Sequence, residues 1–153
     1  MRILAIRGKN LASLAGEFNI DFQSEPLGSA GLFAISGATG AGKSTLLDAL
    51  CLALYERTPR LARASGKGEI PDVGDNGVSP SDPRTILRRG AAEGFAEVDY
   101  VGSDGVPYRA RWSVRRSRSK SDGKLQNSEV SFIRLADMQV LGEHRKTETL
   151  KLI

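Results

Sequence analysis

Residues 37–44 read GATGAGKS, and they separate two segments with different hydrophobic patterns. Before them, residues 32–36 (LFAIS) form a short, continuous apolar run, which is typical of a central strand covered on both faces. After them, residues 44–55 have the spacing of a helix and contain neither proline nor glycine, and Pro59 follows their end. A buried strand, a glycine-rich turn and a helix in this order predict a fold of the α/β class.

The glycine-rich turn matches the pattern GxxxxGK[ST] at Gly37, Gly42, Lys43 and Ser44. Glycine permits positive φ and a close approach of the backbone to phosphate oxygens, so that successive N–H groups can point inward. The start of the following helix adds unpaired N–H groups and the positive end of its dipole. We therefore predict a phosphate-binding loop; the alternative is a structural turn that holds no ligand.

The predicted nucleotide contacts come from the loop and the first helical turn, namely Gly37, Ala38, Thr39, Gly40, Ala41, Gly42, Lys43, Ser44 and Thr45. Lys43 is the expected catalytic residue and should reach the β- and γ-phosphates. The Ser44 hydroxyl is expected to bind Mg²⁺, and Thr45 is expected beside the α-phosphate.

A phosphate loop alone does not hydrolyse a nucleotide, because hydrolysis also needs a second carboxylate on Mg²⁺ and a group that orients water. The nearest approaches to a Walker B strand, residues 97–100 (EVDY) and 134–137 (RLAD), are both interrupted by charge. Asp99 and Gly102 match the D-x-x-G pattern of GTPases, but the chain has no Asn-Lys-x-Asp motif. A nucleoside kinase is equally disfavoured, since lid arginines and a base-binding segment have no clear candidate.

Outside the loop, the patterns mostly predict strands. Residues 2–7 and 16–22 are expected strands, and the second alternates apolar and polar residues. Residues 95–101 and 106–114 should form a hairpin around GSDG, and another strand is expected at 128–136 with a short continuation at 140–142. The polar residues that follow should start a helix, and the absence of a closing cap suggests a longer protein.

Cysteine and histidine content limits the chemistry. Cys51 is the only cysteine, so the chain can form no internal disulfide, and with His144 as the only histidine it cannot supply the four ligands of a zinc site. We expect Cys51 to be a core residue on a buried helix face made by Leu46, Leu47, Leu50, Cys51 and Leu54. His144 is expected to be exposed at the start of the last helix.

No apolar run approaches the roughly 20 residues that a membrane helix needs. The residues after Met1 also lack the apolar region and cleavage site of a signal peptide. We therefore expect no membrane association and a cytoplasmic location.

The positive charge lies mainly in residues 109–124, which carry seven basic residues and one acid, whereas the whole chain has a net charge of +4. In the second hairpin strand, alternation places Tyr108, Ala110, Trp112 and Val114 on one face and Arg109, Arg111, Ser113 and Arg115 on the other. We predict contacts to DNA phosphates, without sequence readout, from Arg109, Arg111, Arg115, Arg116, Arg118 and Lys120. The alternative is a solvated strand face.

Three stretches carry a specific family resemblance: residues 2–22 (RILAIRGKNLASLAGEFNIDF), 31–61 (GLFAISGATGAGKSTLLDALCLALYERTPRL) and 96–118 (AEVDYVGSDGVPYRARWSVRRSR). They closely resemble the N-terminal head segment of the SbcC family, the SMC-related ATPase subunits of a bacterial nuclease that processes DNA ends. The stretch 64–84 is the weakest part of the likeness; its four glycines and three prolines predict a flexible surface loop.

The resemblance implies a P-loop NTPase fold: residues 1–153 would be the N-terminal lobe of an ABC/SMC-type ATPase head, with a mixed and antiparallel sheet. The C-terminal lobe and the coiled coil between the two lobes are absent from this chain. In such heads the signature motif, Walker B and switch histidine lie in the C-terminal lobe, and the glutamine loop should follow residue 153. The chain alone is therefore expected to be inactive.

The resemblance also implies ATP and Mg²⁺ as cofactors, an SbcD-type nuclease and double-stranded DNA ends or hairpins as partners, and a head-to-head homodimer around two ATP molecules. Lys9 and Asn10 are expected near the nucleotide. Ala12 stands where archaeal and eukaryotic relatives have a nucleotide-holding arginine, so the adenine-side contacts are left open.

Two alternatives remain at this point. One is an SMC-related recombination or repair ATPase of the RecF or RecN kind. The full-length sequence would separate the two, because an SbcC protein contains a long heptad insert. The other is a non-catalytic DNA-binding scaffold whose P-loop only stabilises the fold.

Overall fold

The computed structural model describes residues 1–30, 32–62, 68–74, 77–142 and 146–153. Its main layer is a six-stranded sheet in the order β2-β1-β5-β6-β7-β8, and every neighbouring pair is antiparallel. The strands are β1 (Arg2–Leu11), β2 (Leu14–Asp21), β5 (Glu93–Val101), β6 (Pro107–Arg115), β7 (Glu129–Arg134) and β8 (Gln139–Gly142). The strands expected at residues 2–7, 16–22 and 128–136 and the expected hairpin of β5 and β6 are thus confirmed, with β1 longer than predicted. The short continuation expected at residues 140–142 is a separate strand, β8, antiparallel to β7.

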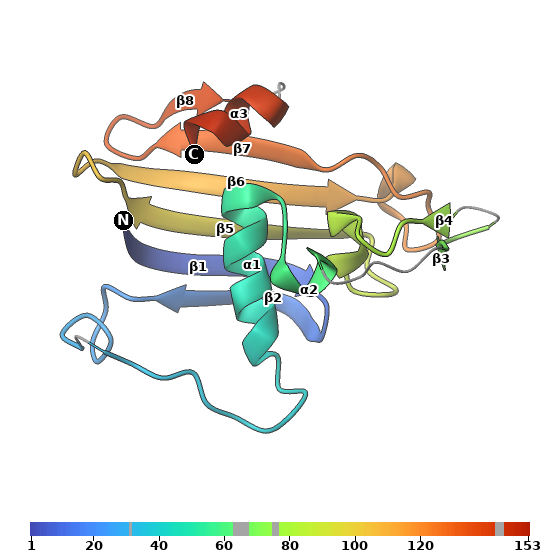
Figure 1. Ribbon diagram of the computed structural model, residues 1–153, viewed down its shortest axis with the longest axis horizontal. Helices are drawn as coiled ribbons and strands as arrows, with labels where there is room; N and C mark the ends of the chain where they lie inside the picture. The colour runs from blue at the N-terminus through green and yellow to red at the C-terminus, as the bar shows by residue number, and fades with distance from the viewer. Residues whose placement is uncertain (31, 63–67, 75–76, 143–145) are drawn as a thin grey trace.

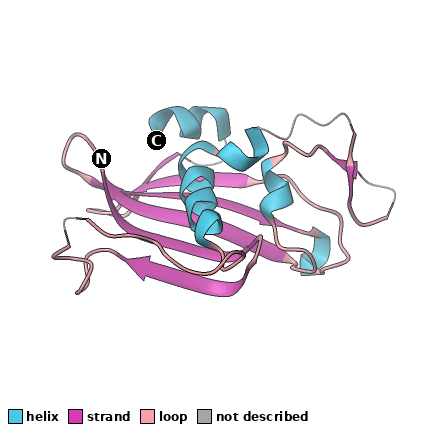
Figure 2. Cartoon of the chain, turned by 60° about the horizontal axis from the view of Figure 1, so that its bottom comes forward, coloured by secondary structure: helices cyan, strands magenta, loops and turns pink. Residues whose placement is uncertain are grey.

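The helices are α1 (Lys43–Tyr55), α2 (Pro59–Ala62) and α3 (Lys146–Leu152), together with the 3₁₀ turns η1 (Pro83–Ile86) and η2 (Ser117–Ser119). Helix α1 crosses the middle of the sheet at a steep angle to the strands (Figure 1). Helix α3 packs beside β7 and β8 on the same side of the sheet as α1 (Figure 2). None of the helices in the described part of the chain is long and apolar enough to cross a lipid bilayer.

The core lies between α1 and the sheet, and the predicted alternation of β6 builds it. Ala110, Trp112 and Val114 are buried against the helix, whereas Arg109 and Arg111 lie on the opposite face. The Trp112 indole also donates a hydrogen bond to the Glu56 carboxylate at 3.3 Å, so its polar edge is satisfied inside the core.

The buried face of α1 differs from the predicted one. The fully buried apolar residues are Ala49, Leu52, Ala53 and Leu54, and Leu50 packs against the core from a partly buried position, so only Leu50 and Leu54 of the predicted face are clearly in the core. Leu47 is 56% exposed and Cys51 is half-buried. Apolar residues occur all around this helix, so their spacing does not select a face. The small side chains of Ala49 and Ala53 allow the helix to approach the sheet closely, and this decides the orientation.

The prediction of a central strand at residues 32–36 is wrong for this chain. The segment is not a strand, and its side chains are exposed, with Leu32 at 92%. A central strand needs a partner on each edge, and no strand in the described ranges pairs with this segment. It runs outside the sheet, beyond β2 (Figure 1), and the Phe33 ring stacks on Phe22 at 4.9 Å between centroids.

The stretch 64–84 is only partly described, since residues 63–67 and 75–76 fall outside the described ranges. Its described part contains a small two-stranded sheet of β3 (Ile70–Pro71) and β4 (Gly77–Val78) and the start of η1, where the Asp82 side chain caps the turn. Its flexibility stays a prediction. His144 lies outside the described residues, so its expected exposure is untested.

Candidate nucleotide-binding site

The glycine-rich loop leads directly into the first turn of α1, as predicted. Gly37, Gly40 and Gly42 have φ of 152°, 85° and 93°, which L-residues with a side chain rarely adopt. Gly42 is also the N-cap of α1 and needs to be glycine for a second reason. A Cβ atom there would lie 2.5 Å from the Leu14 side chain.

Several loop amides have no hydrogen-bond acceptor within the described part of the chain. They include the N–H groups of Gly40, Gly42, Lys43 and Ser44. The first amide of the helix with an internal acceptor is that of Thr45, which donates to the Gly42 carbonyl at 2.9 Å. Unpaired amides at a helix start form an anion site, so this part of the loop fits a phosphate group.

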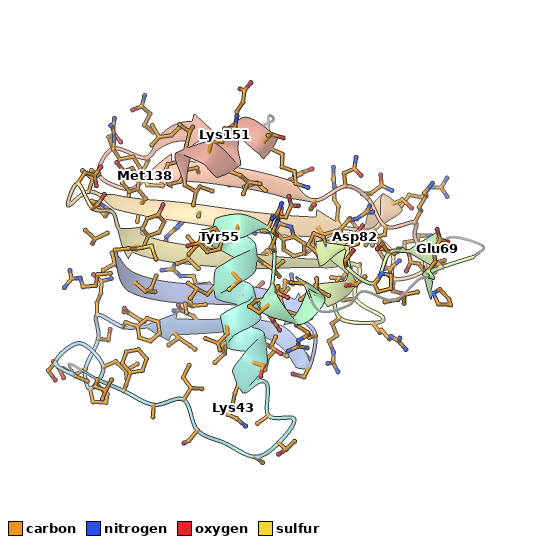
Figure 3. All side chains as sticks on the ribbon, viewed as in Figure 1. Lys43, Tyr55, Glu69, Asp82, Met138 and Lys151 are labelled. Carbon is orange, nitrogen blue, oxygen red and sulfur yellow. The ribbon has the colours of Figure 1, made fainter. Side chains whose placement is uncertain are left out.

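The Lys43 side chain lies at the same end of α1, far from Tyr55 at the other end (Figure 3). Its ammonium donates to the carbonyl oxygens of Gly37 at 2.7 Å and Ala38 at 2.8 Å. Both acceptors are neutral, and hydrogen bonds to a charged phosphate oxygen are stronger. The ammonium is therefore held at the loop by contacts that an anionic ligand can replace.

Ser44 and Thr45 differ in their surroundings. Ser44 is exposed in the first turn of α1, where its hydroxyl could bind a hard cation such as Mg²⁺. Thr45 is only 2% exposed, and its hydroxyl is 3.2 Å from the Ser13 hydroxyl in the turn between β1 and β2. Thr45 therefore links the loop to the sheet, and its contact with an α-phosphate stays a prediction.

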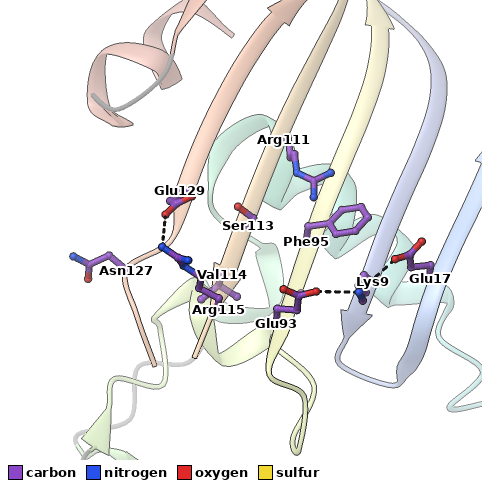
Figure 4. Close-up of a pocket in the computed structure, with 11 residues that line it drawn as sticks. Lys9, Glu17, Glu93, Phe95, Arg111, Ser113, Val114, Arg115, Asn127 and Glu129 are labelled. Carbon is purple, nitrogen blue, oxygen red and sulfur yellow. Dashed lines mark hydrogen bonds and ion pairs between the residues drawn. The ribbon is translucent and has the colours of Figure 1, made fainter. Parts of the chain in front are cut away.

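The structure does not bring the Lys9 ammonium to the loop. Lys9 pairs with Glu93 at 3.0 Å and with Glu17 at 3.4 Å on the face of the sheet opposite α1 (Figure 4). Its hydrogen bonds to these two carboxylates raise the pKa of Lys9. Asn10 has φ of 52°, and its side chain accepts from the Gly16 amide at 2.9 Å, so it shapes the turn between β1 and β2.

An ion pair that sequence reasoning missed anchors α1 from the side. Asp48 is buried and pairs with Arg60 of α2 at 2.6 Å. Burial raises the pKa of Asp48, although Arg60 and a hydrogen bond from Thr58 act in the opposite direction. The two residues occur in the family-specific stretch 31–61, but no pattern of spacing indicates that they meet.

The predicted DNA-contacting residues fall into two groups. Arg109 donates to Asp99 at 2.7 Å and Arg111 to Glu97 at 2.8 Å, on the face of the sheet opposite α1. Burial alone would raise the pKa of Asp99, but the hydrogen bonds from Arg109 and Arg7 bring it below its usual value. Both arginines are therefore already paired within the sheet, in a cluster where Arg7, Arg109 and Arg111 share the two carboxylates of Glu97 and Asp99.

Arg116 is also engaged, because it is 9% exposed and pairs with Asp72 at 2.7 Å. Arg115 is exposed and has only a 3.8 Å contact with Glu129. Arg118 and Lys120 are exposed, and no side chain in the described ranges pairs with them. Of the six residues, Arg115, Arg118 and Lys120 are thus the exposed cations, and the contact of all six with DNA stays a prediction.

A glycine-rich loop with open amides and a lysine at the start of a helix defines a P-loop nucleotide-binding protein. The sequence model of the AAA domain family matches residues 5–149, and the chain belongs to this family. The predicted class, a P-loop NTPase of α/β content, is confirmed. The resemblance implies a mixed and antiparallel sheet, and all strand pairs of the sheet in the described ranges are antiparallel.

The curated relatives share one name and are all SbcC subunits of nuclease SbcCD. The chain is 62% identical over 148 residues to the relative from Pseudomonas aeruginosa, an alignment that covers 97% of this chain and 12% of the relative. It is 55% identical over 141 residues to the relative from Rhodobacter capsulatus, covering 92% of this chain and 11% of the relative. The resemblance to the SbcC family is therefore confirmed, and the chain spans only a small part of the length of these relatives.

Proposed function

We propose that this chain is the ATP-binding half of the ATPase head of an SbcC-type nuclease complex. The observation that carries the proposal is the set of open amides at Gly40, Gly42, Lys43 and Ser44 beside the Lys43 ammonium. These donors suit the triphosphate of ATP, and the exposed Ser44 hydroxyl suits Mg²⁺. The relatives named as SbcC subunits of nuclease SbcCD support the assignment.

The exposed apolar residues near the loop support a second lobe that completes the site. Leu32, Phe33 and Ile35, just before the loop, and Leu47 in α1 are exposed, although residues of these types are usually buried when they occur together. Further strands beside residues 32–36 would pair their backbone groups and cover α1. Such a lobe would supply the second carboxylate and the water-orienting group, so residues 1–153 alone bind ATP without hydrolysing it.

In the proposed complex, an SbcD-type nuclease is the partner, and ATP binding and hydrolysis control its access to double-stranded DNA ends and hairpins. Two ATPase heads form a head-to-head homodimer, and the complex is cytoplasmic. DNA phosphates would contact the exposed cations Arg115, Arg118 and Lys120, of which Arg115 has only a long ion pair, at 3.8 Å, with Glu129. Arg109, Arg111 and Arg116 contribute mainly to the fold through Asp99, Glu97 and Asp72.

The test is ATP binding by the full natural chain that carries these residues, with Lys43→Ala as the variant and Lys151→Ala as the control. Lys151 is exposed in α3, away from the loop (Figure 3). Isothermal titration should show ATP affinity at least tenfold weaker for Lys43→Ala and unchanged for Lys151→Ala. Equal affinity in all three proteins contradicts the proposal. Loss of ATP binding with unchanged DNA affinity and nuclease assembly would instead favour the scaffold alternative.

A further inference from the structure

The turn between β1 and β2 has an unusual backbone. Asn10 and Ala12 have φ of 52° and 43°, in the left-handed region that residues other than glycine seldom occupy. Such conformations persist where the surrounding structure holds them in place. We therefore consider which residues contact the turn between β1 and β2 and which part of the site the turn contacts.

The turn rests on the start of α1. The Ser13 hydroxyl lies 3.2 Å from the Thr45 hydroxyl in the first helical turn. The Leu14 side chain covers Gly42 so closely that a Cβ atom on the glycine would lie 2.5 Å from it. A displacement of residues 12–14 would thus remove two contacts from the loop that we propose to hold the triphosphate.

Arg88, which lies 76 residues further along the chain, holds this turn. Its backbone N–H donates to the Asn10 carbonyl at 2.9 Å. Its Nη1 atom donates to the carbonyl oxygens of both Ala12 and Ser13, each at 3.0 Å. No carboxylate in the described parts of the chain forms an ion pair with Arg88, so these carbonyls are the partners that orient its guanidinium.

We propose that Arg88 is a positioning residue for the nucleotide site. By holding two successive carbonyls, it keeps Ser13 against Thr45 and Leu14 against Gly42, and the loop amides then keep their spacing. The inference rests on the proposed ATP site, and Arg88 acts on it through the turn and not by touching the ligand. A positioning residue at this place lowers nucleotide affinity when it is removed, even in protein that remains folded.

The first experiment measures ATP affinity of the full natural chain by isothermal titration, at a temperature where circular dichroism shows each variant folded. Arg88→Ala should bind ATP about tenfold more weakly. Arg88→Lys should stay within threefold of the parent, because a single nitrogen makes both carbonyl contacts and an ammonium can do the same. The neighbouring exposed Arg89, changed to alanine, is the control and should leave the affinity unchanged.

The second experiment separates positioning from general stabilisation by a double-mutant cycle with Ser13→Ala. If Arg88 acts through Ser13, the double variant binds ATP no more weakly than Arg88→Ala alone. Independent losses that multiply in the double variant overturn the inference. Should Arg88→Ala fail to fold, Arg88→Gln, which keeps one amide donor, replaces it in the same cycle with the same criteria.

Lys43→Ala distinguishes this inference from the proposed function. If Lys43→Ala leaves ATP affinity unchanged, the proposed site itself is wrong. If Lys43→Ala abolishes binding while Arg88→Ala stays within twofold of the parent, the ATP site stands and the role of Arg88 is refuted.

Discussion

Asp48 of α1 and Arg60 of α2 form an ion pair with 2.6 Å between the carboxylate and guanidinium, in which the carboxylate is buried and the guanidinium is half-exposed. Asp48 lies about one turn beyond Ser44, so the pair fixes the helix near the phosphate loop. Thr58 supports the same contact, since its carbonyl and hydroxyl cap the start of α2 by accepting from the Leu61 amide.

The first prediction concerns Arg60→Ala. The change leaves a buried carboxylate without its cation, and we expect a loss of about 1–2 kcal/mol in unfolding free energy at neutral pH, since the arginine is partly solvated. The pKa of Asp48 is raised in the folded protein, so its protonation stabilises the fold as the pH falls toward the raised value. The deficit should therefore shrink in acid, as thermal unfolding at neutral and acidic pH can show.

The control for this prediction is Arg60→Ala in an Asp48→Asn background. With no carboxylate to protonate, the additional loss caused by Arg60→Ala should not depend on pH. A pH-dependent loss in that background would show that Asp48 is not the responsible group.

The second prediction concerns the two reasons why loop positions require glycine, namely positive φ and close packing. Gly42→Ala combines a φ of 93° with a Cβ contact on Leu14, whereas Gly40→Ala has a φ of 85° and no atom within 4 Å. We expect both to lose about 1–3 kcal/mol in unfolding free energy or in ATP binding, from the backbone alone. Gly42→Ala should lose more, and Leu14→Ala should recover part of that difference; equal effects in the two glycine variants would contradict the packing.

The third prediction concerns DNA. In the full protein, neutralising Arg115, Arg118 and Lys120 together should reduce the slope of log affinity against log salt by about 2.7, at about 0.9 per phosphate contact. Duplex titrations over a range of salt concentrations measure it. Arg109→Ala is the matched comparison, and it should lower thermal stability through Asp99 with little change in the slope. The reverse pattern would place the DNA on the face of the sheet that carries Arg109.

The fourth prediction concerns Asp72, which ties the stretch around β3 to the sheet through Arg116. The hydrogen bond from Arg116 lowers the pKa of Asp72, so the stabilisation is present above the unfolded pKa of about 3.9 and is lost as the pH falls through the folded value. Asp72→Asn should lose about 1–3 kcal/mol, because Arg116 stays buried with a weaker partner. Limited proteolysis should then cut residues 68–84 faster than in the parent, and unchanged cleavage would argue against the tether.

Much of the candidate site could be predicted because its signals are local. The pattern at residues 37–44 is a backbone property of glycines followed by a helix start, and the structure places it at the N-terminus of α1. Ser13, Leu14 and Arg88 gave no such signal, because their contacts join segments far apart in the chain. The expectation that Lys9 lies near the nucleotide rests on its sequence neighbours, whereas the direction of its side chain follows from its place in β1, where it pairs with Glu93.

Local patterns were enough to predict the glycine-rich loop, helix α1 and the hairpin of β5 and β6, since glycine conformations and the alternation of side chains depend mainly on neighbouring residues. Contacts between distant segments account for the exposure of Leu47 and residues 32–36 and for the pairing of Arg109 and Arg111 with Asp99 and Glu97. An apolar side chain needs a covering surface and a buried charge needs an opposite charge. Which partner it finds depends on the pairing of strands and on the direction from which a helix meets the sheet.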